Sequence, residues 1–184
     1  MFQASVSPLR WAIATVAFAI GGYLGHLVAG PAATVPAALI SGVVAGAVIG
    51  AAQGAALGFA PRELSLWAGG TGLGLAASLA AVTAFIGQID TTSDAVLLGA
   101  VSGLTVGAAQ AAVLARGDLA HAAVWMAASG IAWALGWLTT ASIGVALAAG
   151  WPVYGMSGAI VSQLITGVVL WRLASRREAT PAPA

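Results

Sequence analysis

Long apolar runs separated by short polar breaks dominate the chain. Six runs reach the roughly 20 residues that a helix needs to cross the ~30 Å hydrocarbon core of a bilayer. They cover residues 11–30, 36–59, 64–88, 93–114, 119–149 and 152–173. The breaks carry helix start signals, such as Pro36 and Pro61 with Glu63. Because the breaks are short, consecutive helices should be antiparallel neighbours. The pattern predicts an all-α, integral membrane six-helix bundle, with residues 11–30 as its first span rather than a signal peptide.

Charge sets the orientation of this predicted bundle. Only 6% of residues are charged and the mean hydropathy is +1.00, whereas soluble domains carry about 25% charged residues. Lysine is absent, and the cations are Arg10, Arg62, Arg116, Arg172, Arg176 and Arg177. All six fall on one side of the predicted bundle, and cytoplasmic loops are the ones that retain arginine. We therefore expect both termini in the cytoplasm, in a multi-pass protein of the inner (cytoplasmic) membrane. Five of the seven tryptophans are interpreted as interfacial belts: Trp11, Trp67, Trp125, Trp151 and Trp171.

A spaced repeat runs through the apolar segments. Three tryptophans are each followed four residues later by a hydroxyl, which gives the pairs Trp11 and Thr15, Trp67 and Thr71, and Trp125 and Ser129. Two helices share three glycines at four-residue spacing, then a glutamine and a leucine: Gly42, Gly46, Gly50, Gln53 and Leu57, and Gly99, Gly103, Gly107, Gln110 and Leu114. The last helix keeps Gly158 and Ser162 in this register but has Ile165 in the glutamine's place, with Gln163 two residues earlier. We interpret residues 1–177 as one domain of three repeated hairpins, at about 8–60, 61–116 and 117–173, followed by a short disordered tail, 178–184.

The repeated motifs carry a resemblance to a group of proteins. One motif is a GxxxGxxQ helix, and the other is clearest in the segment from Trp125 to Trp137, which reads WMAASGIAWALGW. In these features the chain resembles uncharacterised bacterial multi-pass membrane proteins with repeated helical hairpins. The resemblance implies the hairpin architecture and brings no activity with it.

Two kinds of residue are candidates for a functional role inside the bundle. Glycine at every fourth position lets helix backbones approach closely, because association in lipid depends on packing and interhelical hydrogen bonds. Gln53 and Gln110 lie in the half of the bundle near the arginines, at a depth similar to Thr15, Thr71 and Ser129. An unpaired amide in hydrocarbon costs several kcal/mol. These side chains should therefore form either an interhelical polar layer or the lining of a polar pathway.

His26 is the histidine that lies within an apolar span. A neutral imidazole there could bind a metal, a haem or a chlorophyll-type pigment, or pass a proton, and the alternative is an interfacial or helix-packing residue. Trp133 and Trp137 form a stripe that packs on lipid, on another helix, or on a flat pigment or quinone. His26 has no second histidine four residues away and no carboxylate in its helix, so the sequence predicts no metal site and no cofactor. The chain has no cysteine, which removes thiolate ligands and a cysteine nucleophile.

These observations favour a non-enzymatic protein. Its expected partners are the lipid bilayer and other membrane subunits or further copies of itself, in the role of a scaffold or accessory subunit. The alternative is a small-solute or ion channel with a pathway between the hairpins, and the weaker alternative is a pigment- or quinone-binding subunit. Nucleic acid is excluded as a partner, because the net charge is +1 and no cluster of cations forms a binding surface.

Overall fold

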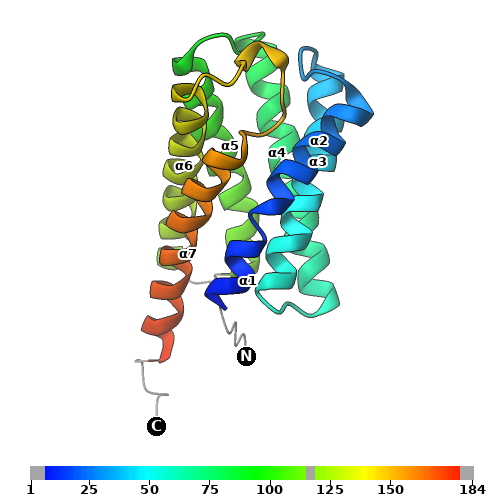
Figure 1. Ribbon diagram of the computed structural model, residues 1–184. Helices are drawn as coiled ribbons and strands as arrows, with labels where there is room; N and C mark the ends of the chain where they lie inside the picture. The colour runs from blue at the N-terminus through cyan, green and yellow to red at the C-terminus, as the bar shows by residue number, and fades with distance from the viewer. Residues whose placement is uncertain (1–6, 115–118, 179–184) are drawn as a thin grey trace.

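All regular structure in the described part of the chain is helical. The computed structural model describes residues 7–114 and 119–178, and its helices run side by side in one bundle (Figure 1). In chain order they are α1 (Pro8–Ile13), α2 (Val16–Ala29), α3 (Val35–Ala56), α4 (Pro61–Phe85), α5 (Thr92–Leu114), α6 (Leu119–Ser142), the 3₁₀ turn η1 (Leu147–Ala149) and α7 (Met156–Glu178). Within the described residues, six stretches are long and apolar enough to cross a membrane, and α1 with α2 forms the first. The predicted all-α six-helix bundle is confirmed.

Both ends of the described chain lie at the same end of the bundle. Figure 1 shows the start of α1 and the end of α7 at the bottom, together with the turn between α3 and α4. We call this the arginine end, because Arg10 and Arg62 lie there in the first turns of α1 and α4. Arg116 and residues 179–184 of the predicted tail lie outside the described residues.

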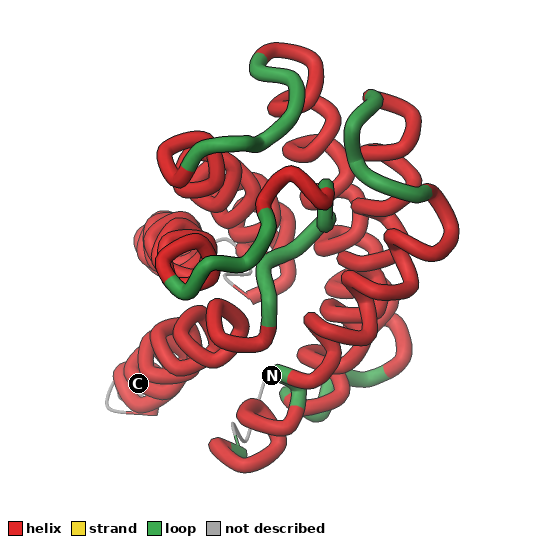
Figure 2. Tube along the Cα trace, turned by 45° about the horizontal axis from the view of Figure 1, so that its top comes forward, coloured by secondary structure: helices red, strands yellow, loops and turns green. Residues whose placement is uncertain are grey.

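The fifth predicted run is not one helix. A helix over residues 119–149 would be about 46 Å long, well beyond the ~30 Å hydrocarbon core. Instead α6 ends at Ser142, and Gly144 follows with a φ of 80°, a conformation that favours glycine. The chain then crosses the end of the bundle opposite the arginines as a loop that contains η1 (Figure 2). Residues 152–154 are buried and not helical, so α7 begins at Met156 rather than at Pro152.

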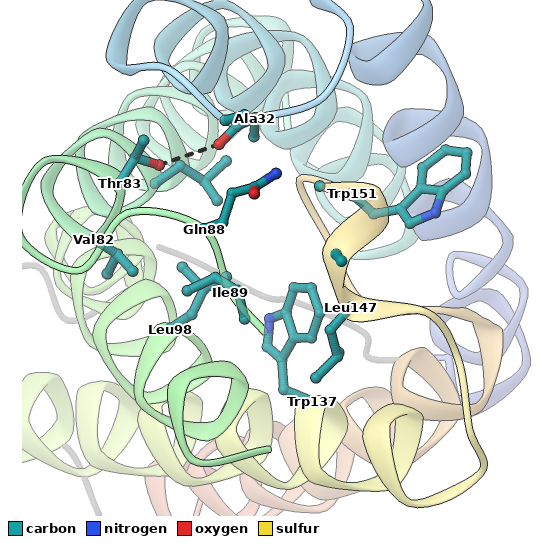
Figure 3. A pocket seen from close by; sticks show the side chains of 13 residues that line it. Ala32, Val82, Thr83, Gln88, Ile89, Leu98, Trp137, Leu147 and Trp151 are labelled. Carbon is teal, nitrogen blue, oxygen red and sulfur yellow. Dashed lines mark hydrogen bonds between the residues drawn. The ribbon is translucent and has the colours of Figure 1, made fainter. Parts of the chain in front are cut away.

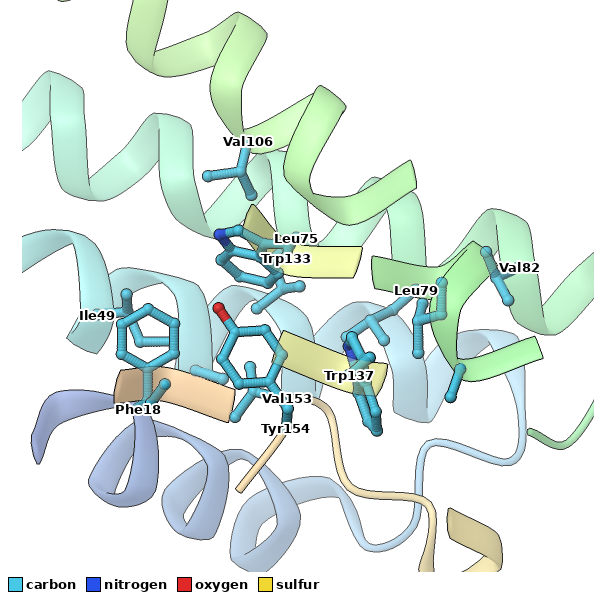
Figure 4. Packing of buried hydrophobic residues seen from close by; sticks show 14 of the residues in the cluster. Phe18, Ile49, Leu75, Leu79, Val82, Val106, Trp133, Trp137, Val153 and Tyr154 are labelled. Atoms are coloured by element: carbon cyan, nitrogen blue, oxygen red, sulfur yellow. The ribbon is translucent and has the colours of Figure 1, made fainter. Parts of the chain in front are cut away.

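Aromatic side chains fill the core toward this opposite end (Figure 4). The ring of Tyr154 stacks on Phe18 at a centroid distance of 5.4 Å and meets Trp133 edge-on at 5.2 Å. Its hydroxyl donates to Ser162 Oγ at 2.7 Å. Trp133 and Trp137 are each only 4% exposed. The predicted tryptophan stripe therefore packs inside the bundle and does not face lipid.

A second cluster of buried side chains lies at the arginine end. It contains Trp11, Trp67 and Trp125, together with Leu57 and Leu114. The rings of Trp67 and Trp125 are 6.1 Å apart. The interpretation of these three tryptophans as an interfacial belt is wrong, because their rings pack between helices rather than on lipid. Trp171, by contrast, is 61% exposed.

Candidate functional site

Three glutamines from three different spans meet inside the bundle. Gln53 on α3 donates from Nε2 to Oε1 of Gln163 on α7 at 2.9 Å. Gln110 on α5 donates from Nε2 to Oε1 of Gln53 at 3.2 Å. All three side chains are buried. The repeat register places Ile165 at the third glutamine's position, with Gln163 two residues earlier, and the structure brings Gln163 itself to Gln53.

The other three spans join the same cluster. Gln110 also donates to Thr71 Oγ1 on α4 at 2.9 Å, and its Oε1 accepts from the indole of Trp125 on α6 at 3.2 Å. On the first span, Trp11 donates from its indole to the backbone carbonyl of Gln163 at 2.8 Å. We call these six residues the glutamine cluster: Trp11, Gln53, Thr71, Gln110, Trp125 and Gln163. Hydrogen bonds through this cluster connect all six spans, so it holds the bundle together at one depth.

One bond of the cluster coincides with a break in the first span. Gln163 Nε2 donates to the carbonyl oxygen of Trp11 at 3.3 Å. In a regular helix that oxygen would accept from the N–H of Thr15, but this N–H donates to Ala12 at 3.1 Å. A side chain that enters the backbone ladder is a recognised cause of a helix kink. The expected single helix over residues 11–30 is accordingly divided into α1 and α2, with Thr15 at the division.

Close packing brings the cluster's helices together. A Cβ added at Gly46 would lie 2.6 Å from the carbonyl oxygen of Thr71, and one at Gly50 would lie 2.8 Å from the Thr71 hydroxyl. Gly107 faces Ser129 in the corresponding way, at 2.9 Å from its Cβ. The same short approaches involve the remaining predicted glycines, Gly42 against Ala76, Gly99 against Trp133 and Ala134, and Gly103 against Ser129 and Gly130. These glycine contacts join α3 to α4 and α5 to α6, across the boundaries of the predicted hairpins.

One polar group at this depth has no hydrogen bond among the described residues. The indole N–H of Trp67 is buried and unpaired, although the corresponding N–H groups of Trp11 and Trp125 are bonded. The Trp67 ring instead meets Phe59 edge-on at 5.4 Å. The three tryptophans of the predicted repeat therefore share a location but not a set of partners.

His26 lies apart from the glutamine cluster, at the opposite end of the bundle. Its ring stacks on Trp151 at a centroid distance of 4.4 Å. Its Nδ1 is buried without a hydrogen bond among the described residues. The described part of the chain contains no group of three or more histidines and carboxylates that could hold a metal ion. Because Trp133 and Trp137 pack on Tyr154, the structure does not assemble the three candidate ligand residues into one site.

A small cavity lies beneath the loop that contains η1 (Figure 3). Its volume is about 20 Å³, and its lining includes Gln88, Leu147 and Trp151. Thr83 donates across its edge to the carbonyl of Ala32 at 3.3 Å. This volume is enough for about one water molecule.

A much larger groove lies on the side of the bundle, between α1 and α2 on one wall and α7 on the other. Its volume is about 540 Å³. The walls are mainly apolar. Two members of the glutamine cluster, Trp11 and Gln163, also line the groove, as does Thr15. The groove is therefore a lateral opening in the spanning region rather than an aqueous entrance.

These features define a multi-pass membrane protein with a buried polar cluster and a lateral apolar groove. Comparison with protein-family models, curated proteins and solved structures found no match. The function is therefore argued from the residues alone.

Proposed function

We propose that this chain is a non-enzymatic membrane protein that acts as a scaffold or accessory subunit. It works through contacts of its outward-facing helix surfaces with lipids and with other membrane helices, including further copies of itself. The observation that carries this proposal is the glutamine cluster, in which the buried amides bond to one another and across all six spans. With its polar side chains engaged internally, the chain offers mainly apolar surface to its surroundings.

The same observation weighs against a channel. A pathway between the helices was expected to pass Gln53 and Gln110, but both donor positions of the Gln110 amide are occupied, by Gln53 and Thr71. A solute that used this route would have to replace these bonds in a region that the glycine contacts hold closed. The quinone or pigment alternative loses its aromatic platform, since Trp133 and Trp137 are buried against Tyr154.

The proposed setting is the inner membrane, with both termini in the cytoplasm. The positions of Arg10, Arg62 and Arg172 support this orientation, because each belongs to the end of a span at the arginine end. Cytoplasmic loops are enriched in arginine relative to short translocated loops.

Reconstitution into vesicles tests the scaffold against the channel. The wild-type protein and the variants Gln53→Leu and Gln110→Leu are compared for flux of ions and small polar solutes, with protein-free vesicles as background. We expect background flux for all three proteins and the same oligomeric mass in mild detergent. Flux of the wild-type protein that disappears in both variants, while their mass is unchanged, would overturn the proposal in favour of the channel.

A further inference from the structure

The lateral groove has a cause in the sequence of α7. On α3, glycines stand three and seven residues before Gln53, and the same holds on α5 before Gln110. On α7 the same two positions before Gln163 hold Ile160 and Met156, and both side chains line the groove. Large side chains thus occupy the positions at which the other two glutamine helices approach their neighbours through glycine.

The facing wall follows the same comparison. Gly50 lies against Thr71 and Gly107 lies against Ser129. Thr15, the hydroxyl at the corresponding place on the first span, lies across the groove from Ile160. Contact between the spans is kept farther along α7, where a Cβ at Gly167 would lie 2.8 Å from the Trp11 ring. Ile160 and Met156 therefore hold open an interface that is closed in the other two pairs.

The size of the groove indicates what fits in it. From Met156 to Trp171 the α7 wall runs for about 22 Å, which exceeds the depth of one leaflet, about 15 Å of hydrocarbon. A helix about 10 Å across and of that length fills roughly 1,700 Å³, so a groove of about 540 Å³ could enclose only part of one. The space suits a single flexible chain rather than a whole helix.

Charge at the arginine end indicates the headgroup. Arg172 directly follows Trp171, which lines the groove at this end, and Arg172 is exposed. Arg10 lines a separate recess, against α3. The described residues of α1 and α2, and those of α7 up to Ser175, include no carboxylate to neutralise Arg172. Guanidinium groups bind phosphate oxygens strongly, and basic residues at a membrane surface attract anionic lipids.

We propose that the groove binds an anionic phospholipid, with one acyl chain between α1–α2 and α7 and the phosphate held by Arg172. This inference rests on the proposed function, for which it names one lipid partner. It accounts for the outer walls of the groove, which include Val16, Leu164 and Val168 and are half exposed and apolar.

Lipid retention tests the site. The full chain is reconstituted in vesicles of equal parts phosphatidylglycerol and phosphatidylcholine, extracted in mild detergent, and weighed intact by native mass spectrometry. We expect one phosphatidylglycerol per chain, retained about tenfold more than phosphatidylcholine. Equal retention of the two lipids would overturn the proposal, as would a co-extracted protein chain that cross-links to residue 164.

Matched variants locate the lipid. Ile160→Trp should fill the groove and lower retention about tenfold, whereas Leu73→Trp, on a lipid-facing position of α4 that is 68% exposed, should not. Val168→Trp serves as a second groove variant if Ile160→Trp does not fold. The change Arg172→Gln should remove the preference for phosphatidylglycerol, while Arg62→Gln should keep it. Equal effects of groove and control variants would refute the site.

The flux assay keeps the two proposals separate. Loss of the lipid result without any flux removes only the lipid site. Flux that depends on Gln53 and Gln110 removes the scaffold, whatever the groove holds.

Discussion

The substitution Gly99→Ala measures how much the close contact between α5 and α6 contributes to stability. The new Cβ would lie 2.6 Å from the carbonyl oxygen of Trp133 and 2.8 Å from Cα of Ala134. Carbon atoms pack best at about 3.5–4.0 Å, so the two helices must separate by roughly 1 Å. Both contacts are with backbone, which cannot rotate away.

Two opposing energies decide the outcome. Overpacking of this kind costs about 1–3 kcal/mol, and a gap of 0.5–1 Å elsewhere along the pair forfeits a quarter to a half of each contact energy. Alanine in place of a helical glycine gains up to about 1 kcal/mol. We therefore expect Gly99→Ala to lower the free energy of unfolding by about 1–2 kcal/mol.

The control is Gly69→Ala on α4, where an added Cβ meets no atom within 4 Å. It keeps the gain in helix propensity without the clash, so it should be neutral or stabilising by up to about 1 kcal/mol. Unfolding is measured for both variants in the same bicelles by steric trapping. If Gly99→Ala proves as stable as Gly69→Ala, the close contact does not constrain the pair and the packing argument fails.

The glutamine cluster, the orientation in the membrane and the burial of the tryptophans can each be tested separately. Gln53→Leu removes hydrogen bonds to two other glutamines and should lower the free energy of unfolding by about 1–2 kcal/mol, at about 0.6 kcal/mol or more per bond. The control Gln88→Leu changes an exposed side chain and should be neutral. Equal stabilities of the two variants would refute a role for the cluster in stability. A reporter active only in the cytoplasm should give signal when fused to the C-terminus and none when inserted beside Asp90, and the reverse pattern would contradict the orientation. Lipids with brominated chains quench the fluorescence of indoles that they contact. Trp171 is exposed and Trp133 is buried, so Trp171→Phe should reduce the quenched fraction and Trp133→Phe should not. A quenched fraction that falls with Trp133→Phe would place that ring at the lipid.

The spans and their antiparallel order could be predicted from the sequence, because bilayer thickness fixes the length of an apolar run and short breaks leave no room for other connections. The facing of the helices could not. In a membrane both the lipid-facing and the buried sides are apolar, so hydrophobic periodicity loses its meaning. For this reason Trp67 and Trp125 were expected at the lipid interface and are instead fully enclosed.

The candidate site was predictable in part. Matching spacing identified Gln53 and Gln110, because both follow glycine rows of the same form. Gln163 follows Met156 and Ile160 instead, so a search for the glycine pattern selected a different register. The signal that would have found it is chemical: a third buried amide in an apolar span needs partners, and the nearest suitable groups are the other two amides. The helix break at Thr15 also depends on Gln163, and no local residue announces it.

The glutamines supply information that the glycine rows lack. Small residues recur every fourth position, so α3 could slide along α4 by one repeat, about 6 Å, and still place glycine against small side chains. The same slide would separate Gln53 from both of its amide partners and leave buried polar groups unpaired, at a cost of several kcal/mol. Glycine therefore sets how closely the helices pack, and the cluster sets their register.

Replacing Gln53, Gln110 and Gln163 together by leucine removes the penalty for the wrong register without removing any apolar surface. We expect this variant to remain helical but to populate more than one packing, seen as more than one set of signals from its seven indole N–H groups by NMR. A single set of seven signals, as expected for the wild type, would show that the register is fixed by the apolar contacts alone.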